Sequence, residues 1–128
     1  MSTNVVYHIV PSETFHAIPE SQAYVTPDLE TTGFIHCTKT CKVLQNVANH
    51  FYKDNTSPYL LLVIDEDKLT SPLKYEAPAP VGNIAPTSEA INSSMDFPHI
   101  YGPINREAII RVAGPLPRGT DGSFLPFE

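Results

Sequence analysis

The spacing of apolar residues predicts a chain of short strands with one well-defined helix. Runs of strand length, rich in β-branched and aromatic residues, occupy residues 5–10, 33–38, 58–65 and 97–102. The run at 58–65, PYLLLVID, is apolar almost throughout, so it predicts a strand buried on both faces. Further strands are expected at 72–77, as a short neighbour of that strand, and within 105–116, after a helical turn capped by Asn105.

Apolar residues recur at helical spacing in the segment after the second predicted strand. They are Val43, Leu44, Val47, Ala48 and Phe51. Thr38 or Thr40 would cap the start of this helix, which we expect to end near Tyr52. A short helix is predicted after Pro11, whereas residues 23–33 are expected to form a connector. Because strands and helices do not alternate regularly, the pattern favours an α+β fold over a doubly wound sheet.

Length and composition indicate one globular domain with long loops. The chain has 128 residues, 41% of them hydrophobic, which suits a single domain over 1–128 with one core. Its 13 prolines exceed the usual share, and residues 78–96 combine Pro, Gly, Ser and Asn without any period. We therefore expect a long loop there, either functional or a simple insertion.

The charge of the chain limits its partners. A formal net charge of -6 would repel a polyanion, so neither nucleic acid nor an anionic membrane is expected as a partner, and a small-molecule ligand suits the charge better. The sequence has neither a long apolar span nor the features of a signal peptide, so a soluble, cytoplasmic protein is expected. The oligomeric state stays open.

The two cysteines are expected to be reduced and to serve packing. Cys37 falls on the strand face opposite His36, and Cys41 falls at the start of the predicted helix. Structural zinc requires four ligands at paired short spacings, which this stretch does not offer, so no metal is expected.

Three histidines occur in apolar extended segments, and the two-residue period of a strand predicts their neighbours. His36 shares a face with Phe34 and Thr38, while Ile35 and Cys37 take the other face. The same period aligns His99 with Phe97 and Tyr101, and His8 with Val6 and Val10.

Each of these histidines, taken alone, could be an ordinary core residue. Burial of all three would require a partner for every ring nitrogen, because an unsatisfied polar group costs about 1–3 kcal/mol. A cleft lined by His36, Thr38, His99 and Tyr101 is the simpler interpretation. His16 and His50 are predicted to lie on the surface.

Several segments resemble one known family over nearly the whole chain. These segments are GFIHCT, VANHFY, LLLVID, KYE, FPHIYGPI and DGSFLP, and they are similar to the family called domain of unknown function 952. That family has been proposed as a compact relative of the ADP-ribosyltransferases, with a further similarity to the RNA 2′-phosphotransferases. The resemblance implies two small packed sheets, arranged as a split barrel, with one main helix.

The resemblance also implies a nucleotide substrate. Nicotinamide dinucleotide (NAD) or an ADP-ribose-like nucleotide would be bound as substrate, with no covalently attached cofactor, and would react at a glycosidic bond. His8 would hold the nicotinamide ribose, His36 would replace a tyrosine that stacks on nicotinamide, and Thr38 would match a hydroxyl position. Glu76 is the nearest acidic candidate for the third motif, where a carboxylate would stabilise an oxocarbenium-like state. Lys42, with Lys39, could meet a diphosphate or simply be solvated.

Two other functions remain open. In the first, His36 and His99 serve as general acid and base in a cofactor-free lyase, isomerase or hydrolase, since the histidine pKa suits neutral pH. In the second, the histidines only bind a ligand. The candidate catalytic residues are His36, His99 and Glu76, and the candidate binding residues are His8, Thr38, Tyr101, Phe34 and Lys42.

Overall fold

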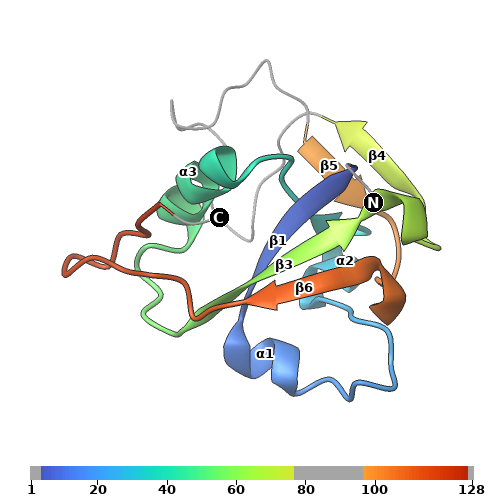
Figure 1. Cartoon of the computed structure of the whole chain (residues 1–128), viewed down its shortest axis with the longest axis horizontal. Coiled ribbons are helices and arrows are strands. Elements are labelled where there is room, and N and C mark those ends of the chain that lie inside the picture. The colour runs from blue at the N-terminus through green and yellow to red at the C-terminus, as the bar shows by residue number, and fades with distance from the viewer. Residues whose placement is uncertain (1–3, 77–96, 127–128) are drawn as a thin grey trace.

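Two antiparallel three-stranded sheets form the framework of the protein (Figure 1). We describe residues 4–76 and 97–126 of a computed structural model of the chain; the predicted loop at 78–96 lies outside these residues. The first sheet has the order β1-β3-β6, and its strands are β1 Val5–Pro11, β3 Tyr59–Asp65 and β6 Ile109–Ala113. The second has the order β2-β5-β4, and its strands are β2 Ile35–His36, β5 Phe97–Ile100 and β4 Leu73–Glu76. The expected α+β fold with two small sheets is confirmed.

Short helices connect the strands. The α-helices are α1 Ser12–His16, α2 Pro27–Thr32 and α3 Cys41–Phe51, and two 3₁₀ turns, η1 Glu66–Lys68 and η2 Arg106–Ala108, precede β4 and β6. α3 is the helix predicted from the apolar spacing. Its cap is Thr40, whose side-chain oxygen accepts a hydrogen bond from the backbone N–H of Val43 at 3.2 Å.

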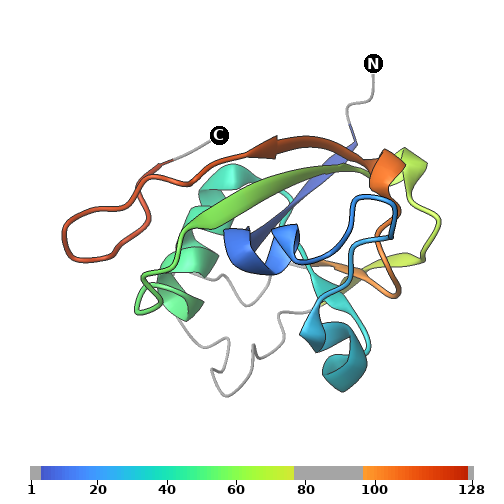
Figure 2. The same cartoon turned by 90° about the horizontal axis from the view of Figure 1, so that it is seen from below.

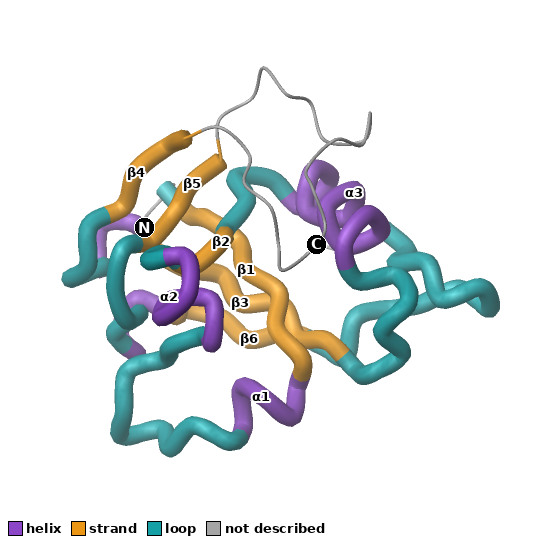
Figure 3. Tube along the Cα trace, turned by 180° about the vertical axis from the view of Figure 1, so that it is seen from behind, coloured by secondary structure: helices purple, strands orange, loops and turns teal. Residues whose placement is uncertain are grey.

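The two sheets meet where β1 passes the end of β2. Tyr7 and Thr38 exchange two backbone hydrogen bonds of 2.7 Å each, so the strands follow one another as β4, β5, β2, β1, β3 and β6 (Figure 3). Directly opposed residues of an antiparallel pair have side chains on the same face. The face that carries His36 therefore continues onto Tyr7, and the face that carries Cys37 continues onto His8.

Each face of the sheet β1-β3-β6 covers its own core. β3 is buried along its whole length and supplies both cores, as its continuous apolar sequence predicts. Leu60, Leu62 and Ile64 join Ile35 and Cys37 in the core that involves both sheets. The other core lies against α3, and its buried members are Ile9, Leu44, Ala48, Tyr59, Leu61, Val63, Leu116 and Phe124.

Two predictions about secondary structure were wrong. Residues 23–33 are not only a connector, because they contain α2, which begins with Pro27 in its first turn and ends at Gly33 with a φ of 87°. β4 does not neighbour β3. The chain passes from the first sheet to the second through η1, so β4 pairs with β5. β2 is also shorter than the predicted run at 33–38.

The chain after β6 forms a loop that projects from the molecule and returns to α3 (Figures 1 and 2). Phe124 fixes the return: its backbone N–H donates to Asn49 at 2.6 Å, and its carbonyl accepts from Gln45 at 3.0 Å. The described residues include no helix that is long and apolar enough to span a membrane.

Candidate functional site

Two of the three histidines singled out in the sequence lie opposite each other on β2 and β5. His36 and His99 are paired in register, and their ring centroids are 5.6 Å apart. Ile35 and Ile100 point the other way and are 0% exposed, so alternation along both strands places the imidazoles on the outer face of the sheet β2-β5-β4.

Aromatic rings complete this face. Phe34 stacks on His99 with a centroid distance of 4.1 Å and an interplanar angle of 22°, and it lies 4.8 Å from His36. The Tyr101 ring is 5.3 Å from Phe34. With Glu76 of β4, these residues form a group that we call the histidine cluster: Phe34, His36, Glu76, His99 and Tyr101.

Glu76 connects the members of the histidine cluster. Its Oε1 accepts hydrogen bonds from the Tyr101 hydroxyl at 2.5 Å and from His99 Nδ1 at 2.9 Å. Because a carboxylate only accepts, Nδ1 must carry the proton. Within the described residues, neither Glu76 Oε2 nor His99 Nε2 forms a hydrogen bond. The His99 side chain is 3% exposed and that of Glu76 is 38% exposed, so the carboxylate is accessible beside a buried imidazole.

The hydrogen bonds also set the charge of Glu76. The Tyr101 hydroxyl, and then His99, hold the pKa of the Glu76 carboxyl below its usual range, and the same bond raises the pKa of Tyr101. The cluster therefore contains an anionic carboxylate next to a neutral phenol at neutral pH.

The other sequence candidates lie outside the histidine cluster. His8 is on the opposite face of the joined sheets, where Nδ1 donates to the His36 carbonyl at 2.6 Å and Nε2 lies 2.9 Å from the Tyr24 hydroxyl. Thr38 is buried and pairs through its backbone with β1. Lys42 is exposed in the first turn of α3, and no hydrogen bond or ion pair joins it to the cluster within the described residues.

Lys39 and the two cysteines have other neighbours. Lys39 forms an ion pair with Glu66 at 2.6 Å. Cys37 is buried in the core between the sheets, where burial raises the pKa of its thiol, and Cys41 packs against the core under α3. Both cysteines are free thiols.

A pocket of about 210 Å³ lies at the open edge of β1, and sequence analysis did not anticipate it. Six of its lining residues are His8, Ile9, Tyr24, Thr26, Tyr52 and Tyr59. The Thr26 hydroxyl is buried and has no hydrogen-bond partner within the described residues. Such a group is costly unless a ligand or water satisfies it.

The backbone of β1 adds hydrogen-bonding groups to this pocket. Tyr7 directs its N–H and C=O to Thr38, and alternate residues of a strand direct these groups to the same edge. The N–H and C=O of Ile9 therefore point to the same edge, beyond Tyr7, where the chain after β2 bridges to β1. The result is an adjacent donor and acceptor among aromatic rings.

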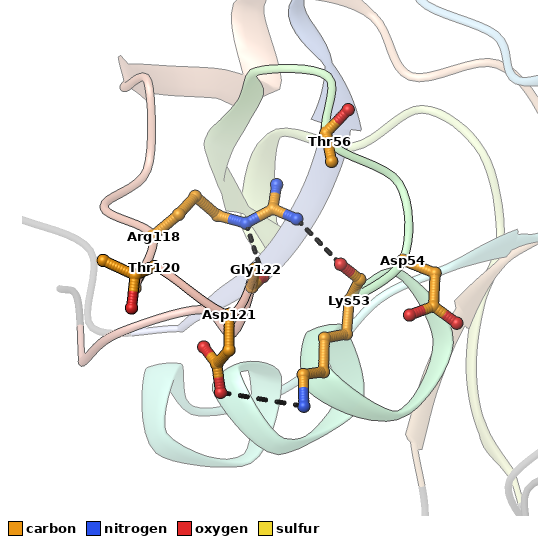
Figure 4. A pocket seen from close by; sticks show the side chains of 8 residues that line it. Lys53, Asp54, Thr56, Arg118, Thr120, Asp121 and Gly122 are labelled. Carbon is orange, nitrogen blue, oxygen red and sulfur yellow. Dashed lines mark hydrogen bonds and ion pairs between the residues drawn. The ribbon is translucent and has the colours of Figure 1, made fainter.

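A second pocket, of about 420 Å³, lies between the C-terminal loop and the connection from α3 to β3 (Figure 4). Arg118 donates from this site to the carbonyl oxygens of Gly122, Lys53 and Asn55 at 2.9, 3.1 and 2.7 Å. Lys53 also lies 3.8 Å from Asp121. Because its cations already contact the protein's own oxygens, we interpret this pocket as structural.

The chain is thus a small α+β protein in which two antiparallel sheets meet at one edge and one sheet carries paired histidines on its outer face. The chain belongs to the family described as protein of unknown function DUF952, whose sequence model matches residues 9–112. The resemblance inferred from GFIHCT and FPHIYGPI is thereby confirmed.

Two solved structures are similar to the chain, and both are of one bacterial protein. The crystal structure of protein CC0527 from Caulobacter crescentus has a TM-score of 0.69 and 22% sequence identity, and the match covers 94% of this chain and 93% of that chain. A double mutant of the same protein has a TM-score of 0.69 and 21% identity, with the same coverage. This likeness supports the fold. No curated protein matches the chain.

Proposed function

We propose that the protein is an enzyme that binds NAD or an ADP-ribose-like nucleotide and acts at its glycosidic bond. The observation that carries the proposal is the Glu76 carboxylate, which is held ionised within an aromatic group and keeps one oxygen without a hydrogen bond in the described residues. Cleavage of an N-glycosidic bond passes through an oxocarbenium-like state, which a nearby carboxylate stabilises.

The chemistry assigns a role to each member of the pair that Glu76 forms with His99. As the bond from ribose C1′ to the pyridinium nitrogen breaks, its electron pair leaves with nicotinamide, and positive charge develops on the sugar beside Glu76. His99 Nε2 then accepts a proton from the water that attacks C1′, so that ADP-ribose, nicotinamide and one proton result. The rings of Phe34 and His36 offer a surface for the planar base.

The pocket at the edge of β1 supports the same substrate class. The adjacent N–H and C=O of Ile9 complement the ring nitrogen N1 and the amino group of an adenine, and the Thr26 hydroxyl offers a further bond. One hydrogen bond, from His8 to the carbonyl of His36, joins the pocket wall to the histidine cluster. In this proposal the nicotinamide half of a dinucleotide binds at the cluster and the adenine half at the pocket.

Nicotinamide release and dinucleotide binding, measured on one folded preparation, test the proposal. We expect both, and we expect His36→Ala to weaken binding and turnover together, because contact with the base already exists in the ground state. His50→Ala, which changes a histidine on α3, is the matched control. Neither binding nor release by the wild-type protein would contradict the proposal.

Thr26→Val should separate binding from stability. The substitution removes a buried hydroxyl without a partner and keeps the shape of the side chain, so we expect the free energy of unfolding to rise by about 1 kcal/mol. Thr26 makes no side-chain cap bond to α2 that could be lost. The dissociation constant for the dinucleotide should increase several-fold. Urea unfolding and calorimetry measure the two effects, and unchanged affinity would exclude Thr26 from binding.

Tyr101→Phe should change the pH dependence of turnover. The Tyr101 hydroxyl is the largest cause of the lowered pKa of Glu76, which also faces His99 on its neighbouring strand and Lys74 on its own. Because its pKa is lowered, Glu76 stays ionised as the pH falls through about 4.3, the ordinary pKa of a glutamate, and activity is lost only at still lower pH. Without the hydroxyl, the acidic limb should move to higher pH. Tyr75→Phe, which removes a tyrosine bond to Glu66 instead, should leave the limb in place.

A cofactor-free acid–base enzyme is the second candidate, favoured by the bond between His99 Nδ1 and Glu76. This bond orients the imidazole and leaves Nε2 to exchange a proton with a substrate, opposite His36. This candidate predicts no dinucleotide affinity and a bell-shaped pH profile on another small metabolite. A non-catalytic binding module would instead take up a ligand without forming product.

A further inference from the structure

We propose that Lys74 makes the histidine cluster selective for a substrate that carries a phosphate group next to the reacting sugar. The inference rests on the proposed function and names the substrate class of the same site. Lys74 of β4 is paired in register with His99 of β5, so its side chain leaves the sheet on the outer face, with Glu76 two residues further along. Its Nζ lies 4.9 Å from the centroid of the Tyr101 ring.

The Lys74 ammonium differs in its contacts from four other cations of the chain. Lys39 and Lys53 lie 2.6 and 3.8 Å from the carboxylates of Glu66 and Asp121. Arg106 and Arg118 donate to backbone carbonyl oxygens. Lys74 forms no ion pair within the described residues: its ammonium contacts the face of an aromatic ring and interacts with the Glu76 carboxylate only through a weaker coulombic attraction. Its charge therefore remains available to a ligand.

The negative charge of Glu76 explains why a cation at the position of Lys74 matters for a phosphorylated substrate. Glu76 is anionic, and the whole chain carries a formal charge of -6, so a phosphorylated substrate that approached the cluster would be repelled. A cation on the same face offsets that repulsion where the phosphate would lie. Lysine is suited to this role because its ammonium is a point charge on a flexible stem that can follow a phosphate.

Two substrates that differ by one phosphate test the inference. Nicotinamide mononucleotide and nicotinamide riboside share the same glycosidic bond, and nicotinamide release reports turnover of both. We expect the wild-type kcat/KM to be at least about tenfold higher for the mononucleotide, a difference equivalent to about 1.4 kcal/mol. Lys74→Gln should remove this preference by lowering the value for the mononucleotide only. The preference should also shrink as salt is added.

Lys68→Gln is the matched control, because Lys68 is an exposed lysine away from the cluster, and it should keep the wild-type preference. An equal preference in the wild-type protein and in Lys74→Gln would overturn the inference while leaving the proposed function intact. Absence of release from both substrates would instead contradict the proposed function. Calorimetry with the same two compounds then tests the role of Lys74 in binding. Tighter binding of the mononucleotide that is lost in Lys74→Gln supports phosphate selectivity by Lys74, and equal binding of the two compounds refutes it.

Discussion

Glu76→Gln is expected to lower kcat for nicotinamide release by at least about 100-fold while changing dinucleotide affinity by less than about threefold. The amide has nearly the shape of the carboxylate and can still accept the bonds from Tyr101 and His99 through its oxygen. It lacks the negative charge, however, and that charge matters most when the sugar becomes cationic. Single-turnover nicotinamide release and calorimetry measure the two quantities separately.

The chain offers a close control for this substitution. Glu66 also accepts a hydrogen bond from a tyrosine hydroxyl, that of Tyr75 at 2.7 Å, and lies beside a cation, Lys39, but it is outside the histidine cluster. Glu66→Gln should leave kcat near the wild-type value. Similar losses in both variants would show that Glu76 acts through stability, and an unchanged kcat in Glu76→Gln would remove it from the reaction.

The losses of kcat caused by Glu76→Gln and by His99→Asn should not be additive. His99 is oriented by its bond to Glu76, so the double variant Glu76→Gln with His99→Asn should be little slower than the slower single variant. Additive losses would indicate two independent contributions and would favour a role for His99 that does not need the carboxylate.

The part of the histidine cluster that the sequence predicted is the part that depends on local periodicity. Alternation along a strand is fixed by backbone geometry, so the shared face of Phe34 and His36, and that of His99 and Tyr101, could be predicted without knowing the sheet. The buried position of Cys37 followed from the same rule.

The remaining placements depend on contacts between distant segments. Periodicity says which residues of one strand share a face, but it gives no common reference between strands, and the bridge from Tyr7 to Thr38 puts His8 on the face opposite His36. Lys74 lies on the outer face beside His99 because β4 pairs with β5, a pairing that the sequence did not predict. Thr26 lines a pocket only because its loop lies next to β1.

The sequence contains local signals for α2, the helix that was not predicted. The segment TPDLETTG places Pro27 at the start and Gly33 at the end of α2, which is the usual asymmetry of helix ends. Its six residues are too few to show an apolar period, so the connector was preferred. Short helices are therefore better predicted from their ends than from their spacing.

Arg118→Ala is expected to lower the free energy of unfolding by about 3 kcal/mol, because one side chain satisfies several carbonyl oxygens of two loops. Its guanidinium donates to Gly122, Lys53, Asn55 and Ser57 at 2.7 to 3.2 Å, and its central carbon lies 3.9 Å from the centroid of the buried Phe124 ring. Without these bonds the return of the chain to α3 loses its support.

Urea unfolding of Arg118→Ala and Arg118→Lys measures this contribution and its origin. Lysine keeps the charge but lacks the planar set of donors, so Arg118→Lys should lose most of the same stability. Lys68→Ala, an exposed cation on η1, should change stability by less than about 0.5 kcal/mol. Full stability in Arg118→Lys would show that charge rather than geometry holds the loop. Because Arg118 belongs to the structural pocket and not to the histidine cluster, nicotinamide release per folded molecule should stay at the wild-type rate in Arg118→Lys.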